Sequence, residues 1–135
     1  MNETTDVDQV GAIPPPFAKA GPDEPEPVEF EEWERERLSS TVGVVSTVSP
    51  DGTPHATPAQ VSLEDGVIKF ETDIGSRKHR NLESNPRIAV CVFGKPKWGV
   101  LVQGRAEVLS EGGPRNQVQF QVVPRRKASW RKKED

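Results

Sequence analysis

The chain has 135 residues, of which 33% are hydrophobic, and a formal net charge of −3. This length allows one domain, and the single cysteine excludes a disulfide framework and argues against a cysteine-rich metal site. No apolar run approaches the roughly 20 residues that a membrane-spanning helix needs, so we expect no membrane partner.

Charge is distributed unevenly along the chain. Residues 1–37 hold eleven acidic and three basic side chains, a net charge of −8, whereas residues 38–135 hold ten acidic and fifteen basic ones, a net charge of +5. The larger part is therefore cationic, which suits an anionic ligand. A phosphorylated cofactor and nucleic acid both qualify, and charge alone does not separate them.

The first stretch, residues 1–27, contains six prolines between Pro14 and Pro27 and has no apolar periodicity. We expect a disordered or extended acidic arm there. Its start has neither the basic residues nor the apolar core of a signal peptide, which predicts a cytoplasmic protein. The folded domain is predicted over residues 28–124, and a basic tail over residues 125–135 follows it.

A single amphipathic helix is predicted over residues 28–40, because Phe30 and Trp33 recur at helical spacing among charged side chains. From residue 41 the apolar period changes to two, which is typical of strands. Turns with Gly or Pro separate the strands, which we expect at residues 41–48, 54–63, 67–72, 88–93, 98–108 and 118–122, and a second short helix is expected at residues 77–84. Closing the sheet removes exposed edges, so the predicted fold class is mainly β, a six-stranded antiparallel barrel.

Two of these strands carry further signals. Residues 88–93 are apolar on both faces, which indicates a strand buried on both sides, as in a closed barrel or at a dimer seam. Gly104 stands in the middle of the next strand and predicts a bulge or a sharp bend.

The stretch with the clearest chemical purpose is Gly75-Ser76-Arg77-Lys78, at the predicted start of the second helix. Free backbone N–H groups and the positive end of the helix dipole favour an anion at such a start. A phosphate would fit there. From these residues alone, a solvated helix end whose Arg77 and Lys78 face water remains the stronger alternative.

Residues 70–87 resemble the phosphate-binding segment of the pyridoxamine 5'-phosphate oxidase-like split-barrel family of flavin and deazaflavin proteins. A strand ending in Thr72 is followed by the Gly-Ser-Arg-Lys turn, by Arg80-Asn81-Leu82, and by Asn85-Pro86-Arg87 leading into a strand. The resemblance extends more loosely over residues 38–130. It favours the phosphate site over the solvated helix end, and it implies a split β-barrel whose cofactor lies at the seam of a homodimer.

The resemblance also implies which residues bind the cofactor, the deazaflavin coenzyme F-420 or FMN. The residues expected at the phosphate end are Thr72, Ser76, Arg77, Lys78 and Asn81. Those expected beside the ring system or its side chain are Thr57, Pro58 and Ala59. No catalytic side chain and no metal is expected, because the cofactor itself performs the hydride transfer.

Two departures from the family pattern bear on the activity. Family members usually carry a helical segment before the last strand, whereas only a turn of a few residues follows Val108 here. True pyridoxamine phosphate oxidases have a basic, apolar, basic pattern in the second strand and a Gln near the start of the fifth; this chain has Thr57-Pro-Ala-Gln-Val-Ser62 and Gly99. Pyridoxamine phosphate is therefore not the expected substrate. The sequence of residues 78–87 is more similar to the deazaflavin-dependent branch of the family, so F-420 is the first choice of cofactor and FMN the second.

These observations predict an oxidoreductase that uses a flavin or deazaflavin to transfer a hydride to or from a small organic acceptor. Two alternatives stay open: a cofactor carrier without turnover, ranked second, and a nucleic-acid-binding module, ranked third. The last rests on six cations around Trp130 in the tail. A solvated end attracted to the acidic arm explains these cations better.

The two histidines are the remaining candidates for a catalytic or metal-binding role. His55 is expected at the surface edge of a strand, and His79 on a helix face that approaches a phosphate. Neither belongs to a spacing typical of metal ligands.

Overall fold

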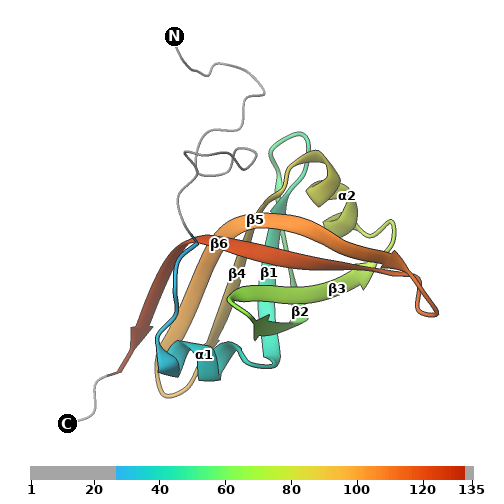
Figure 1. The fold of residues 1–135 in the computed structure, drawn as a ribbon. Helices are drawn as coiled ribbons and strands as arrows, with labels where there is room; N and C mark the ends of the chain where they lie inside the picture. The colour runs from blue at the N-terminus through green and yellow to red at the C-terminus, as the bar shows by residue number, and fades with distance from the viewer. Residues whose placement is uncertain (1–26, 133–135) are drawn as a thin grey trace.

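The structure is a computed structural model, and it describes residues 27–132 (Figure 1). Its helices and strands follow in the order α1 Glu32–Leu38, β1 Thr41–Val48, β2 Pro54–Glu64, β3 Val67–Asp73, α2 Arg77–Ser84, β4 Arg87–Gly94, β5 Trp98–Gly112 and β6 Gln117–Arg131. Neighbouring strands are antiparallel and close into a barrel in the order β1-β2-β3-β6-β5-β4. The predicted fold class is confirmed. The expected arm lies, apart from Pro27, outside the described residues.

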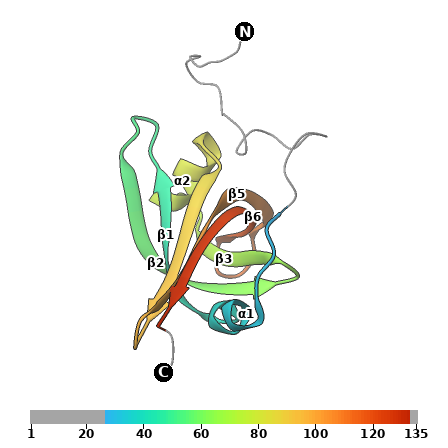
Figure 2. The ribbon, with the colours of Figure 1, turned by 90° about the vertical axis from the view of Figure 1, so that its left-hand side faces the viewer.

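The barrel is filled by one face of each strand, as a period of two requires. The inward side chains of four strands are almost fully buried: Val45, Val90, Val92, Val100, Val102, Val118, Phe120 and Val122. Figures 1 and 2 show α1 below the barrel and α2 above it. Leu38 of α1 and Leu82 of α2 both join the buried core, so each helix is fixed to the barrel by apolar packing.

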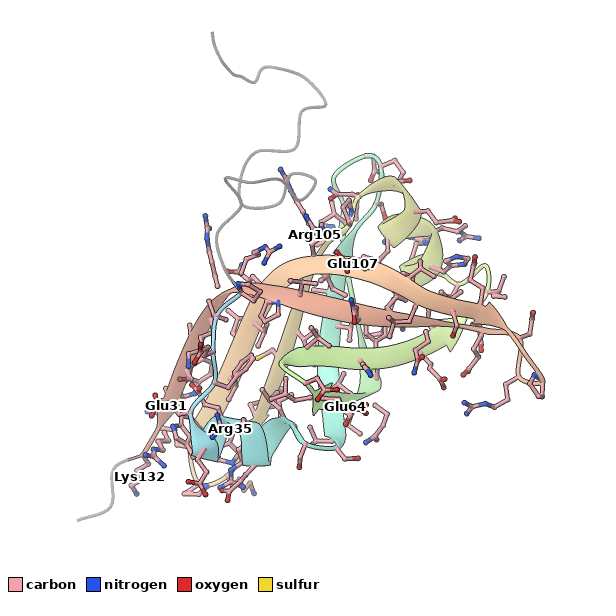
Figure 3. The ribbon with its side chains drawn as sticks, in the orientation of Figure 1. Glu31, Arg35, Glu64, Arg105, Glu107 and Lys132 are labelled. Carbon is pink, nitrogen blue, oxygen red and sulfur yellow. The ribbon has the colours of Figure 1, made fainter. Side chains whose placement is uncertain are left out.

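The pairing register of β5 and β6 shifts at Gly104, which confirms the predicted bulge. A Cβ on Gly104 would lie 2.1 Å from the carbonyl oxygen of Val123, so only glycine fits there. Beside the bulge, Arg105 is buried and forms an ion pair of 3.1 Å with Glu107 (Figure 3). The bulge thus lies between the two longest strands, next to this charged pair.

The last strand is longer than predicted. β6 continues to Arg131, so the boundary expected after Pro124 lies inside the strand, and most of the expected tail is paired with β5. Pro124 has no N–H to give to a ladder, but it lies opposite Gly104 at the bulge, where proline is tolerated. Its carbonyl oxygen accepts a hydrogen bond of 3.2 Å from Val28 N–H.

The first helix is shorter than the predicted residues 28–40, and a buried carboxylate attaches it to β6. Glu34 accepts hydrogen bonds from Lys127 Nζ at 2.5 Å, from Ser129 Oγ at 2.5 Å and from Glu31 N–H at 2.8 Å. Burial raises the pKa of Glu34, but these hydrogen bonds together outweigh burial and hold the pKa below its ordinary value of 4.5. A tail cation, Lys127, is therefore engaged with an acidic helix of the same chain.

The fourth strand is fully buried on its inner face only. Ile88, Val90 and Val92 point into the core, whereas Phe93 on the outer face is 65% exposed. The outward residues Ala89 and Cys91 are half-buried, so the single chain buries the outer face of β4 only in part, and a dimer seam over that face stays a prediction. No helix in the described part of the chain is long and apolar enough to cross a membrane.

Candidate functional site

The turn between β3 and α2 is held by two hydroxyl groups. Thr72 Oγ1, at the end of β3, lies 2.9 Å from Ser76 Oγ, so the two side chains share a hydrogen bond. Ser76 caps α2, because its Oγ also accepts the His79 N–H at 3.2 Å. Gly75 permits the turn, since its φ of 85° is the left-handed conformation that glycine adopts readily. The structure thus brings together Thr72 and Ser76, two of the residues expected at the phosphate end.

Lys78 lies in the first turn of α2 and reaches β2. Its Nζ donates a hydrogen bond of 2.6 Å to Thr57 Oγ1, and its side chain is half-buried. Among residues 27–132, no carboxylate lies within ion-pair distance of Lys78. A half-buried ammonium at a helix start without a counter-ion is an unfavourable arrangement that an anion would relieve. The Lys78–Thr57 pair is therefore the centre of the candidate site.

Asn81 lies on the same face of α2 but is buried within the fold. Its Nδ2 donates a hydrogen bond of 3.0 Å to Thr47 Oγ1 on β1, and the residue is only 1% exposed. This bond fastens α2 to the barrel, so Asn81 acts in the first place as an anchor of the helix that carries Lys78.

Arg77 points to another part of the surface than Lys78. It lines an open hollow of about 810 Å³ between α2 and the β1–β2 turn, together with Ser49, Pro50, Asp51, Thr53, Arg80, Asn81, Glu83 and Ser84. Hydrogen bonding from Thr53 and, to a smaller degree, the nearby Arg77 guanidinium lower the pKa of Asp51. Lys78, the other cation that the sequence prediction assigns to the phosphate, is not among the residues that line this hollow, and the joint role of the two cations stays a prediction.

The three expected residues of β2 lie on two faces. Thr57 and Ala59 are half-buried on the inner face, whereas Pro58 is exposed on the outer face and pairs with Val44 of β1. Of the three, Thr57 contacts α2, through its hydrogen bond with Lys78.

His79 is a residue whose role the sequence prediction missed. It is 6% exposed, and its Nδ1 accepts a hydrogen bond of 2.9 Å from Gly75 N–H. The ring proton is then on Nε2, which lies 3.5 Å from Glu83 and 3.6 Å from Glu111 of β5. His79 therefore ties the turn at the helix start to the barrel. Its spacing of three residues from the buried Leu82 is the sequence signal for an inward position.

Comparison with known proteins identifies the fold and the family. The family model described as pyridoxamine 5'-phosphate oxidase matches residues 30–134. A pyridoxine/pyridoxamine 5'-phosphate oxidase of Rubrobacter xylanophilus is 34% identical over 103 residues, which cover 70% of this chain and 47% of the relative. The chain spans about half the length of the curated relatives it matches.

Solved structures agree with the barrel. A conserved hypothetical protein from Mycobacterium tuberculosis superposes with a TM-score of 0.67 at 25% identity, covering 78% of this chain and 86% of that one. An F420 reductase superposes with a TM-score of 0.61 at 23% identity, covering 75% and 98%, which shows a shared fold. The family model spans most of the chain, and with the barrel and the α2 site it places this protein in the pyridoxamine 5'-phosphate oxidase family of flavin-binding split barrels.

Proposed function

We propose that the chain binds the phosphate of a flavin or deazaflavin at the start of α2 and serves as an oxidoreductase. The observation that carries this proposal is the half-buried Lys78, which donates to the neutral Thr57 hydroxyl and has no carboxylate partner in the described part of the chain. The groups of the site fit a phosphate: they are the charged hydrogen-bond donor Lys78, the hydroxyls of Thr72 and Ser76, and the start of a helix.

Each residue of the candidate site has a separate part in binding the phosphate. Lys78 would exchange the Thr57 hydroxyl for a phosphate oxygen, a charge-assisted hydrogen bond stronger than the one it makes now. Ser76 and Thr72 would orient the phosphate, and Asn81 holds the helix in place through Thr47. When bound, the cofactor supplies hydride transfer to or from a small organic acceptor, so no side chain of this protein needs to act as acid or base.

The expectation that pyridoxamine phosphate is not the substrate has support in the β5–β6 packing. The indole ring of Trp130 lies over Gly99, where an added Cβ would come within 2.1 Å of the ring. A Gln side chain, which true pyridoxamine phosphate oxidases have near this point, would require Trp130 to move. This supports a substrate other than pyridoxamine phosphate and leaves F-420 first and FMN second.

We further propose a homodimer, with a second copy of the chain on the outer apolar face. This face is defined by outward side chains of β1, β4, β5 and β6: Val42, Val44, Cys91, Phe93, Leu101 and Trp130. Val42 is 61% exposed and Phe93 65%. Residues Val44, Cys91 and Leu101 are directly paired across three strands, so the patch is continuous. Cys91 is a free thiol in it, which fits the expected reducing cytoplasm.

A cofactor carrier is the second candidate function. The observation that favours it is the connection between β5 and β6, which is a turn over residues 113–116 without a helical segment. A site that lacks one wall can hold a cofactor while failing to orient a substrate. Nucleic-acid binding ranks below both, since Lys127 of the basic stretch is engaged by Glu34 and Arg131 lies 4.7 Å from the Trp33 ring.

Titration of the purified protein with F-420 and with FMN, followed by cofactor fluorescence, tests the proposal. Binding of one of them, and reduction or oxidation of quinones or enones by the loaded protein, are the expected results. Tight binding without turnover on any acceptor would leave the carrier. If neither cofactor binds, the redox function is wrong.

A further inference from the structure

His55 contains a buried ring nitrogen that no part of the fold uses. Its Nδ1 is inaccessible to solvent and has no hydrogen-bond partner among the described residues. The sequence prediction placed His55 at a strand surface, but the residue is half-buried on the inner face of β2. Buried polar atoms in proteins are nearly always hydrogen-bonded, and an unmade bond destabilises the fold. Such an atom therefore indicates a missing partner.

The position of His55 indicates where that partner lies. His55 is paired across the β1–β2 ladder with Thr47, and it shares its strand face with Thr57, two residues further on. These two threonines are the residues that accept hydrogen bonds from α2, from Asn81 and from Lys78 respectively. His55 is thus a direct neighbour, across the ladder and along the strand, of both residues to which α2 is hydrogen-bonded.

We infer that His55 is a further binding residue of the phosphate site, and that its Nδ1–H donates a hydrogen bond to an oxygen of the bound phosphate. The inference rests on the proposed function. The group it recognises is an oxyanion, because a second donor on the strand face of Thr57, the partner of the Lys78 ammonium, suits an acceptor of negative charge. An anion would give an acceptor of negative charge both to the orphaned nitrogen and to the lysine, whose partner is otherwise a neutral hydroxyl.

The test compares ligands with and without the phosphate on variants of one residue. FMN and riboflavin have the same ring and ribityl chain, and they differ only in the phosphate. His55→Leu removes the donor, whereas His55→Asn keeps one, because the amide nitrogen of Asn stands where Nδ1 stands in His. Glu64→Gln, an exposed change at the end of the same strand, serves as the control. Dissociation constants are measured by flavin fluorescence, and denaturant unfolding verifies that each variant folds.

We expect His55→Leu to weaken FMN binding by about ten- to a hundredfold, the value of one hydrogen bond to a charged group, and to leave riboflavin binding unchanged. His55→Asn should recover most of the FMN affinity. If FMN binds His55→Leu as it binds the unchanged protein, or if both ligands lose affinity equally, the inference is wrong while the proposed function stands. F-420 and its phosphate-free chromophore are compared in the same way. If neither these two nor FMN binds the unchanged protein, both the inference and the proposed function fail.

Discussion

Lys78 Nζ donates a hydrogen bond of 2.6 Å to Thr57 Oγ1, and this contact joins two segments that lie 21 residues apart in the sequence. The pair sets the position of the ammonium before any ligand arrives. Because a neutral hydroxyl stabilises a lysine less than an anion does, the arrangement is prepared to exchange one partner for the other. The cost of ordering the lysine side chain is met by folding, which favours affinity.

Lys78→Ala should therefore weaken phosphate binding more than any other single change on α2. We expect a loss of roughly 1.5–3 kcal/mol in the binding free energy of FMN or F-420, the range for a hydrogen bond to a charged group. Arg77→Ala should cost less, because Arg77 lines the hollow on another side of the helix. The double variant should bind more weakly than either single variant and keep its fold.

Arg80→Ala is a matched control for these variants, since Arg80 is an exposed cation of the same helix. Fluorescence titration gives the affinities, and circular dichroism verifies the fold. Equal affinity in the Lys78→Ala variant and the unchanged protein would show that the helix start is a solvated surface.

His79 should control the rigidity of the turn at Gly75. Replacing His79 by Ala leaves the Gly75 N–H without its protein acceptor and removes a buried ring; because Gly75 is exposed and water can replace the acceptor, the lost hydrogen bond should cost about 0.5–1.5 kcal/mol. Hydrogen exchange of the Gly75 amide should accelerate, and cofactor affinity should fall with it. His79→Asn should restore part of both, because its Oδ1 can accept where Nδ1 did. Unchanged amide exchange in His79→Ala would contradict this role.

The Glu34–Lys127 contact should make stability depend on pH. The pKa of Glu34 in the folded protein lies below its ordinary value of 4.5, so its stabilising effect is complete above pH 4.5 and is lost as the pH falls through the folded-state pKa. We expect the free energy of unfolding to decrease over that acidic range, and the decrease to be smaller in Glu34→Gln. Urea unfolding at a series of pH values measures both curves. Identical slopes in the two proteins would refute the assignment.

The Lys127→Met variant tests the same contact by removing its cation instead of its carboxylate. It leaves a fully buried carboxylate with fewer donors, and should lower the unfolding free energy at neutral pH by roughly 1.5–3 kcal/mol. Lys97→Met, at an exposed loop position, is the comparison and should have little effect. If the two variants unfold alike, Lys127 contributes nothing specific.

The barrel could be predicted from sequence because its determinants are local. Alternation of apolar residues, turns with Gly or Pro, and Gly104 in mid-strand all act within a few residues of one another. The extent of β6 could not be predicted in this way. Beyond Pro124 the chain is cationic, and those residues become part of a strand because β5 pairs with them and because Glu34, 93 residues away, binds Lys127.

The candidate site likewise has features that follow from local sequence and features that depend on tertiary contacts. The Ser76 cap and the Lys78 position follow from a motif, but the partner of Lys78 depends on the register of the β1–β2 hairpin. His55 looked like a surface residue, since nothing in the sequence of β2 indicates that its Nδ1 is buried. Arg77 and Lys78 are neighbours in the sequence, yet successive helical residues are about 100° apart, so they separate toward different surfaces.

Disruption of the outer apolar face should convert the proposed dimer into monomers. A charge at Val42 or Phe93 would have to be buried against the second copy, which is strongly unfavourable, so Val42→Glu and Phe93→Glu should each shift the equilibrium toward the monomer. Val108→Glu is the matched control: Val108 is 52% exposed, close to the 61% of Val42, but it lies outside the outer apolar face. Sedimentation velocity at micromolar concentration distinguishes the two states. Since the resemblance implies a cofactor at the seam, the two dimer variants should also lose cofactor affinity, whereas Val108→Glu should retain both assembly and binding. A monomer for the unchanged protein would count against the dimer and the shared site together.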